Sequence, residues 1–342
     1  MNVVVKLMRW ILYGAAGLIG LYFVAALVLT FWPEPSFAVE LELPTGDALP
    51  VAGEEAETGY ETVHFTARDG GSLFARQFGD ESPVTVLLLH GVTGDSSRFV
   101  TSADALQKTT GAQVIALDLR GHGQSGGKSG DIAHLGQYEE DVADVVAAIR
   151  AQQPDGQVIL AGHSMGGGIA LRHALLADAP TIDGYLLYAP HLGTSAPTMP
   201  AAPADEASAA AADQFLQLHI PRILGLTMLN AAGIRPLNGL ATMFFNLPPT
   251  FTRTYSYRAM ASSSPIDYRA VLEAVDAPML VLVGSNDEAF VAEQFPPTVT
   301  AHSEGEVLII DGETHDGIYN NPAALAAAQA WMQTNGFAPV TQ

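Results

Sequence analysis

The stretch Val158-Ile-Leu-Ala-Gly-His-Ser-Met-Gly166 places a serine between two glycines, directly after an apolar run. Residues 158–161 are continuously apolar, as in a strand buried on both faces, and residues 167–176 are compatible with a helix. The glycines permit a tight strand-to-helix turn that exposes the serine oxygen, and the start of the helix favours negative charge beside it. A bare G-x-S-x-G also occurs in glycine-rich turns. In this context the pattern predicts that Ser164 is a nucleophile.

A serine nucleophile needs a base, and the base needs a carboxylate that orients it. Asp287 follows the apolar run 279–283, which places it at the same sheet edge as Ser164. His315 follows a further strand-like run and lies after Asp287 in the chain. We therefore expect Ser164, Asp287 and His315 to form a catalytic triad, with Glu288 as the main competitor for the acid.

The oxyanion that forms during attack on an acyl group needs backbone N–H donors. One donor is expected from Met165, the residue directly after the nucleophile. The second is expected from Val92 in the loop His90-Gly-Val-Thr-Gly94, because the preceding glycine allows the backbone to turn inward.

Short apolar runs alternate with helix-like segments beyond Tyr60, a pattern typical of a mostly parallel sheet covered by helices on both faces. Strands are expected near residues 60–66, 72–78, 84–89, 113–118, 157–162, 183–188, 278–284 and 306–310. Helices are expected near 97–109, 136–152 and 322–334. The alternation fails at about 191–265, which we interpret as a lid inserted into a catalytic domain of residues 59–342. Its apolar side chains are expected to line an acyl path, namely Phe215, Leu224, Met228 and Phe244.

From these motifs the chain resembles the monoglyceride lipase and lysophospholipase-like branch of the α/β hydrolases. The pieces that carry the resemblance are His90-Gly91, Asp118-Leu-Arg-Gly-His-Gly-Gln-Ser-Gly126, Gly162-His-Ser-Met-Gly-Gly167, Gly284-Ser-Asn-Asp287 and His315. The resemblance covers residues from about Tyr60 to the end. It implies an α/β-hydrolase fold and acyl-ester hydrolysis under a lid, with the triad on Ser164, Asp287 and His315. It does not identify the substrate.

The amino terminus carries an uncharged apolar run of 23 residues, 10–32. As a helix the run reaches about 34 Å, enough to span a bilayer. Lys6 and Arg9 precede it, whereas the next basic residue is Arg68, so the positive-inside rule places the amino terminus in the cytoplasm and the catalytic domain on the other side.

We therefore expect a transmembrane anchor over residues 1–32 and an acidic tether over 33–58. The alternative is a secreted protein released by signal-peptide cleavage at Ser36-Phe37-Ala38, with a mature start near Val39.

Composition narrows the choice of partners. The net charge of −21 repels phosphate backbones, so nucleic acid is a poor candidate partner. Without cysteine there is no thiolate metal site, and no histidine–carboxylate cluster has convincing metal spacing. Gly121-His-Gly-Gln-Ser-Gly126 fits a dinucleotide fingerprint, but no acidic residue ends a following strand at the required spacing, so a structural turn is favoured. We expect no cofactor and no metal, and the sequence leaves the oligomeric state open.

These observations favour a membrane-tethered serine hydrolase that cleaves carboxylic esters through an acyl-enzyme, with monoacylglycerol or lysophospholipid as substrate. The same triad would also serve a thioesterase, an acyltransferase or a small-amide hydrolase. A binding protein built on a hydrolase fold is the alternative outside enzymes.

Overall fold

The computed structural model describes residues 2–37, 59–201 and 215–337. Most of the expected tether, 38–58, lies outside the described residues. The described part of the chain contains a central sheet of eight strands. Their order across the sheet is β1 (Tyr60–Thr66), β2 (Ser72–Phe78), β4 (Gln113–Leu117), β3 (Val84–Leu89), β5 (Gln157–His163), β6 (Gly184–Tyr188), β10 (Met279–Gly284) and β11 (Glu306–Ile310).

The sheet is parallel from β4 to β11, whereas β1 and β2 pair antiparallel with each other and β2 pairs antiparallel with β4. Strands β3, β4, β5, β6 and β10 consist almost entirely of buried residues, which explains their continuous apolar sequences. The predicted α/β-hydrolase fold with a mostly parallel sheet is confirmed. Each observed strand end agrees with its sequence-based position to within one residue.

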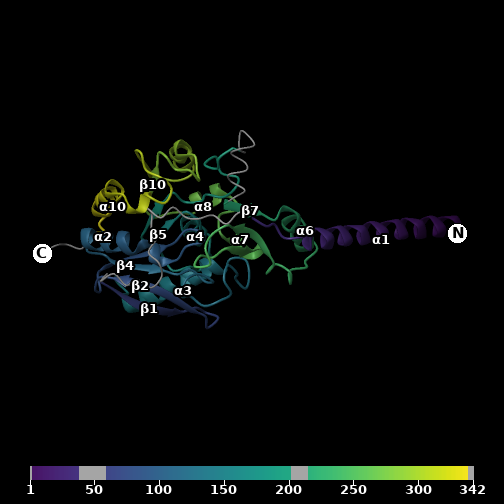
Figure 1. Ribbon diagram of the computed structural model, residues 1–342, viewed down its shortest axis with the longest axis horizontal. Coiled ribbons are helices and arrows are strands. Elements are labelled where there is room, and N and C mark those ends of the chain that lie inside the picture. The colour runs from purple at the N-terminus through teal and green to yellow at the C-terminus, as the bar shows by residue number, and fades with distance from the viewer. Residues whose placement is uncertain (1, 38–58, 202–214, 338–342) are drawn as a thin grey trace.

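Helices cover both faces of the sheet (Figure 1). One face carries α2 (Val100–Thr110) and α10 (Pro322–Thr334), and the other carries α3 (Gln137–Gln152), α4 (Met165–His173) and α8 (Tyr268–Glu273). Short elements complete the domain: α9 (Phe295–Thr300), which packs on β11, and three 3-10 helices, η1 (Ser96–Phe99), η2 (Ala292–Gln294) and η3 (Ile318–Asn320). The helix expected at 97–109 is thus divided between η1 and α2.

The chain leaves the central sheet after β6 and returns to it at β10. We call residues 191–265, which lie between them, the inserted segment. It contains a second sheet of β7 (Leu216–Leu218), β8 (Ala241–Phe245) and β9 (Thr254–Ser256), with α6 (Ile220–Ala231) and α7 (Tyr257–Ser262). Both strand pairs are antiparallel. The sequence did not predict these strands, because they are short and carry no sustained alternation.

The amino-terminal helix α1 (Asn2–Thr30) projects from the domain as a long rod (Figure 1). By length and composition alone, Val3–Thr30 could cross a membrane, and most of its side chains are exposed. The helix includes Lys6 and Arg9 and ends three residues before Pro33. Among the described residues, the end of α1 nearest the domain packs on the helix α6.

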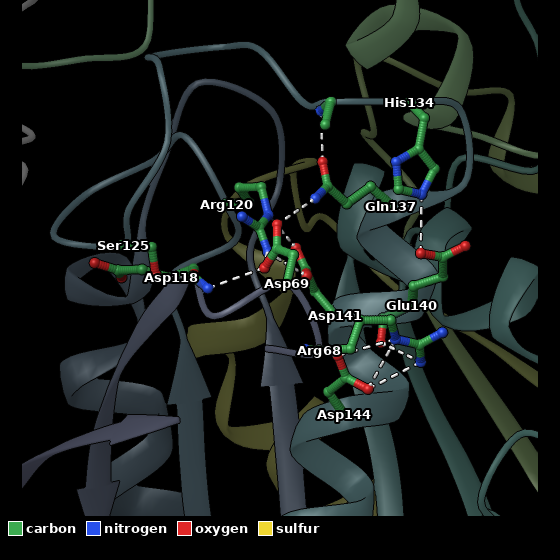
Figure 2. Close-up of polar contacts among 12 residues, drawn as sticks. Arg68, Asp69, Asp118, Arg120, Ser125, His134, Gln137, Glu140, Asp141 and Asp144 are labelled. Carbon is green, nitrogen blue, oxygen red and sulfur yellow. Dashed lines mark hydrogen bonds and ion pairs between the residues drawn. The ribbon is translucent and has the colours of Figure 1, made fainter. Parts of the chain in front are cut away.

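The loop after β4, residues 118–126, forms a closed turn tied to the body of the domain. The N–H of Gly121 donates to the carbonyl of Gly126 at 3.0 Å. Arg120 lies between two carboxylates, with Nη2 2.7 Å from Asp141 on α3 and 3.0 Å from Asp69 (Figure 2). These contacts explain the glycine-rich pattern of residues 121–126 as a structural turn.

Candidate active site

Ser164 lies at the turn between β5 and α4 with φ of 51° and ψ of −116°, a strained conformation for a residue other than glycine. The turn closes tightly against its surroundings. A Cβ on Gly166 would come within 2.3 Å of the Leu89 carbonyl oxygen, and one on Gly162 within 2.5 Å of the Gly166 carbonyl. The Ser164 side chain does not cap α4, so the hydroxyl remains available for chemistry.

Neighbouring strands hold the backbone at this turn. The N–H of Ser164 donates to the carbonyl of Tyr188 at the end of β6, and its carbonyl accepts from His191. Ala189, the residue after Tyr188, donates to Leu282 of β10 at 2.8 Å. Because β5, β6 and β10 run parallel side by side, their carboxyl ends meet at one edge of the sheet.

The structure brings His315 and Asp287 together at this edge. Nδ1 of His315 lies 2.8 Å from Oδ2 of Asp287, whose side chain is fully buried. The other oxygen of Asp287 accepts the N–H groups of Ala289 and Phe290 at 2.9 and 2.8 Å. A carboxylate can only accept here, so Nδ1 carries the proton and Nε2 of His315 is left as an acceptor.

Glu288, the competing acid, has a different position. Its Oε2 accepts the backbone N–H of His315 at 3.0 Å and does not bond the imidazole ring. The carbonyl of His315 accepts from Nε2 of His163 at 3.0 Å, and the ring of Phe290 meets the His315 ring edge-on at 5.1 Å. Backbone and ring of His315 are therefore fixed by separate partners.

His163 was not singled out by the sequence analysis. Burial, with a further contribution from the neighbouring His315, lowers the pKa of His163 to about 3, so it is neutral at neutral pH. Its ring lies 4.7 Å from the His315 ring, between centroids. Its position next to Ser164 in the sequence was the only available signal, because its contact with His315 spans 152 residues.

The ligand atoms of His163, His315 and Asp316 lie within 4.8 Å of one another, close enough to consider a metal ion. However, His163 Nε2 already donates to the carbonyl of His315, and His315 Nδ1 to Asp287. A metal would have to displace these hydrogen bonds, so the cluster fits a hydrogen-bonded histidine pair better than a metal centre.

The loop predicted to carry the oxyanion donor lies against the nucleophile. A Cβ on Gly91 would come within 3.4 Å of the Ser164 Cβ, so the loop backbone passes directly beside the serine. Val92 follows Gly91, and Met165 is the first residue of α4. The two amides predicted to bind an oxyanion therefore belong to segments that flank Ser164.

The inserted segment forms hydrogen bonds with both backbone groups of Thr93, the residue after Val92. Thr93 has φ of 66°, its N–H donates to the Tyr255 hydroxyl at 2.7 Å, and its carbonyl accepts from Thr252 at 3.1 Å. Tyr255 is fully buried on β9, and its hydroxyl also lies 2.7 Å from Nε2 of His122. His122 Nδ1 faces the Arg120 carbonyl and carries the proton, so the Tyr255 hydroxyl donates to Nε2. Sequence reasoning missed this contact.

A cavity of about 240 Å³ adjoins the same loop and is bounded by the inserted segment. Polar and glycine residues form most of its wall: Thr93, Gly94, Asp95, Gly121, Gly123, Ser125, Gly127, Ser129, Pro249, Thr250, Phe251 and Thr252.

The four residues expected to line an acyl path lie outside the wall of this cavity and on different surfaces. Leu224 is exposed on α6, Met228 packs in the cluster beside α1, Phe215 is exposed, and Phe244 is buried near His219.

Comparison with known proteins identifies the family. The family model described as serine aminopeptidase, S33, matches residues 80–316, more than half of the chain. Mouse protein phosphatase methylesterase 1 is 32% identical over 139 residues, 40% of this chain and 36% of that protein. The monoacylglycerol lipase of Mycolicibacterium smegmatis is 38% identical over 88 residues, 26% of this chain and 31% of that protein. The chain thus spans about a third of the length of these relatives.

Solved structures share the fold. A bacterial membrane phospholipase A aligns over 99% of this chain and all of its own, with 21% identity and a TM-score of 0.57. An esterase from Thermogutta terrifontis aligns over 80% of this chain and 99% of its own, with 20% identity and a TM-score of 0.56. From the family match, the chain belongs to the serine aminopeptidase S33 family of serine hydrolases, and it has the α/β-hydrolase fold that these solved structures share.

Proposed function

We propose that this serine hydrolase is a membrane-anchored carboxylic ester hydrolase that uses Ser164 as nucleophile, His315 as base and Asp287 as orienting acid. The observation that carries the proposal is the hydrogen bond between His315 Nδ1 and the buried Asp287, at the sheet edge where Ser164 occupies a strained turn. Strain and a buried, fully bonded carboxylate are both typical of a site built for catalysis.

In this mechanism Oγ of Ser164 attacks the ester carbonyl carbon as its proton passes to Nε2 of His315. The negative oxygen that forms is bound by the N–H groups of Val92 and Met165. His315 then returns the proton to the leaving alcohol, which gives an acyl-enzyme on Ser164. Water then attacks the acyl carbon as its proton passes to Nε2 of His315. The bond to Ser164 Oγ breaks, Oγ takes the proton back from His315, and the acid is released. Asp287 remains ionised and stabilises the imidazolium that forms in each half of the reaction.

The proposed substrates are lipids with one acyl chain, monoacylglycerol or lysophospholipid. Support comes from the chain's similarity to a monoacylglycerol lipase and from its apolar amino-terminal helix, which would hold the enzyme beside membrane lipid. A thioester or small amide is the competing substrate class.

Labelling and a substrate panel test this proposal. A fluorophosphonate should form an adduct on Ser164 in folded, detergent-solubilised protein and none in Ser164→Ala. Hydrolysis of monoacyl lipids, acyl thioesters and aminoacyl amides of matched chain length should favour the lipids. A higher kcat/KM for the amides or thioesters would replace the ester assignment while keeping the triad.

We also propose that α1 spans the membrane, with the amino terminus in the cytoplasm and the hydrolase domain, residues 59–342, on the other side. The charge bias of Lys6 and Arg9 supports this orientation. Protease added to intact spheroplasts should remove the domain, and sequencing should find the native amino terminus. A protected domain would reverse the orientation, and a mature start near Val39 would replace the anchor with a cleaved signal peptide.

A further inference from the structure

Helix α6 of the inserted segment packs along the last turns of α1 (Figure 1). The residue contacts show that the two helices run in opposite directions. Arg222 near the start of α6 contacts Thr30, at the end of α1. One turn further along α6, the backbones of the two helices are so close that a Cβ on Gly225 would lie 2.5 Å from the Ala26 carbonyl oxygen. At the next turn, the carbonyl of Met228 accepts from the Tyr22 hydroxyl at 2.7 Å.

Polar contacts join the end of α1 to the start of α6. Nε of Arg222 donates to the Thr30 carbonyl at 2.9 Å, and its Nη1 donates to Glu34 at 2.9 Å and to the Ala241 carbonyl at 2.7 Å. His219 Nδ1 accepts from the N–H of Arg222, so its Nε2 carries the proton and donates to the Trp32 carbonyl at 3.0 Å. The bond from Arg222 Nε satisfies the carbonyl of Thr30, which the end of α1 leaves without a helical partner. The contacts join α6 and α1 into one unit.

The opposite face of α6 is exposed and, apart from Thr227, its larger side chains are apolar. Ile220 and Leu224, one turn apart, are 51% and 52% exposed, and Leu218 just before the helix is 44% exposed. Arg222 is the one charged residue of α6, and it faces α1 rather than this surface. We call Leu218, Ile220 and Leu224 the outer face of α6.

The position of α6 along α1 indicates what covers this face. The hydrocarbon core of a bilayer is about 30 Å thick, or about 20 helical residues. If α1 enters it just after Arg9, the core extends to about residue 30. The part of α1 from Tyr22 to Thr30 that α6 contacts then lies in the half of the bilayer nearest the hydrolase domain. Because α6 is fixed to that part, its outer face must lie at the same depth.

We propose that the outer face of α6 is a lipid-binding surface inserted into the domain-side leaflet of the bilayer that α1 spans. This contact fixes the depth of the inserted segment in the membrane. The inserted segment then lies between the bilayer surface and the sheet edge that carries Ser164. The inference rests on the proposed membrane span of α1. It goes beyond the span because a spanning α1 does not by itself place the inserted segment in the bilayer.

Depth-dependent quenching of a fluorescent probe tests this proposal. The chain lacks cysteine, so a single introduced cysteine can be labelled with an environment-sensitive NBD probe. Leu224→Cys and Ile220→Cys report on the outer face, Leu18→Cys on the exposed middle of α1, and Leu308→Cys on the edge strand β11. Strand β10, which pairs with β11, lies on the far side of the domain from α1 (Figure 1). The full-length proteins are reconstituted in vesicles of phosphatidylethanolamine and phosphatidylglycerol at a ratio of about 3:1.

We expect a lipid carrying a nitroxide at acyl carbon 5 to quench the probes at positions 224 and 220 several-fold more than the probe at 308. Aqueous iodide should quench position 308 and spare the other two. If position 18 is quenched by the lipid but position 224 by iodide, the surface is in water and the proposal is overturned, although the membrane span stands. A probe at 224 shielded from both quenchers indicates a second copy on this face and also overturns it. Access of iodide to position 18 would overturn the span itself.

Gly225→Leu in the Leu224→Cys background tests the role of packing. The larger side chain cannot fit between the helices, so lipid quenching at position 224 should fall while hydrolysis of p-nitrophenyl butyrate persists. Thr227→Leu adds the same side chain to the exposed side of α6 and should leave the quenching unchanged. Unchanged lipid quenching in Gly225→Leu would show that contact with α1 does not set the depth of α6.

Discussion

The carboxyl edge of the central sheet and the inserted segment are held in place by different kinds of contact. At the sheet edge, buried parallel strands align backbone groups, and Ser164, Asp287 and His315 stand in loops directly after β5, β10 and β11. In the inserted segment, the strands are short and partly exposed, and side chains such as Arg222 and Tyr255 reach residues more than 150 positions away. The first region is organised by strand order, the second by single long-range contacts.

The largest expected effect follows from removal of the proposed nucleophile or the proposed base. Ser164→Ala and His315→Ala should each lower kcat by at least about 10⁴-fold, since members of such a unit fail together. The melting temperature should stay within a few degrees of the parent, because neither side chain supports the sheet. Ester hydrolysis by the purified variants is the measurement. Retention of a tenth of the activity by Ser164→Ala would remove it from the mechanism.

The two neighbouring carboxylates allow a sharper test of the sheet edge. Asp287→Asn should lower kcat by about 10⁴-fold, because an amide in place of the carboxylate favours the wrong tautomer of His315. Glu288→Gln weakens only the acceptor of the His315 backbone N–H and should cost on the order of tenfold. The reverse ranking would assign the acid to Glu288.

Tyr255→Phe should break the contact between the inserted segment and the loop at Val92. It leaves the N–H of Thr93 and Nε2 of His122 without their partner, at a cost of about 1–3 kcal/mol per unsatisfied group. We expect kcat to fall on the order of tenfold for short and long esters alike, with KM nearly unchanged. Tyr257→Phe removes an exposed hydroxyl that bonds Thr227 and serves as the matched control. If both variants behave like the parent, Tyr255 does not position the loop.

The smallest effect concerns stability rather than activity. His173 on α4 is buried, and neither ring nitrogen has a hydrogen-bond partner among the described residues. Burial lowers its pKa to about 4 from an ordinary value near 6.5. Between these values the unfolded chain binds the proton and the folded chain does not, so stability falls as pH drops from about 6.5 to about 4.

His173→Leu should therefore raise the melting temperature at pH 5 more than at pH 7.5. It should also flatten the pH dependence of the free energy of unfolding by up to about 1.4 kcal/mol per pH unit. Thermal unfolding of parent and variant at matched ionic strength provides the comparison. An identical difference at both pH values would show that this histidine titrates alike in the folded and unfolded chains.

The sequence by itself determined the α/β architecture, because buried parallel strands require apolar runs that are read directly from the residues. It also predicted Ser164, Asp287 and His315, since each follows such a run and parallel strands bring their carboxyl ends to one edge. The bond between His315 and Asp287 lies at that edge, whereas the oxyanion assignment to Val92 and Met165 stays a prediction.

Only the tertiary structure decided how His163 and Glu288 fix the backbone of His315, how Tyr255 holds Thr93, and how Arg222 and Gly225 join α6 to α1. These contacts leave no periodic signal, because each depends on one polar group or one missing side chain that meets a distant segment. The same reason explains why Leu224 was expected beside an acyl path and instead lies on the outer face of α6. Apolar character predicts that a residue avoids water, but only packing decides whether protein or lipid covers that residue.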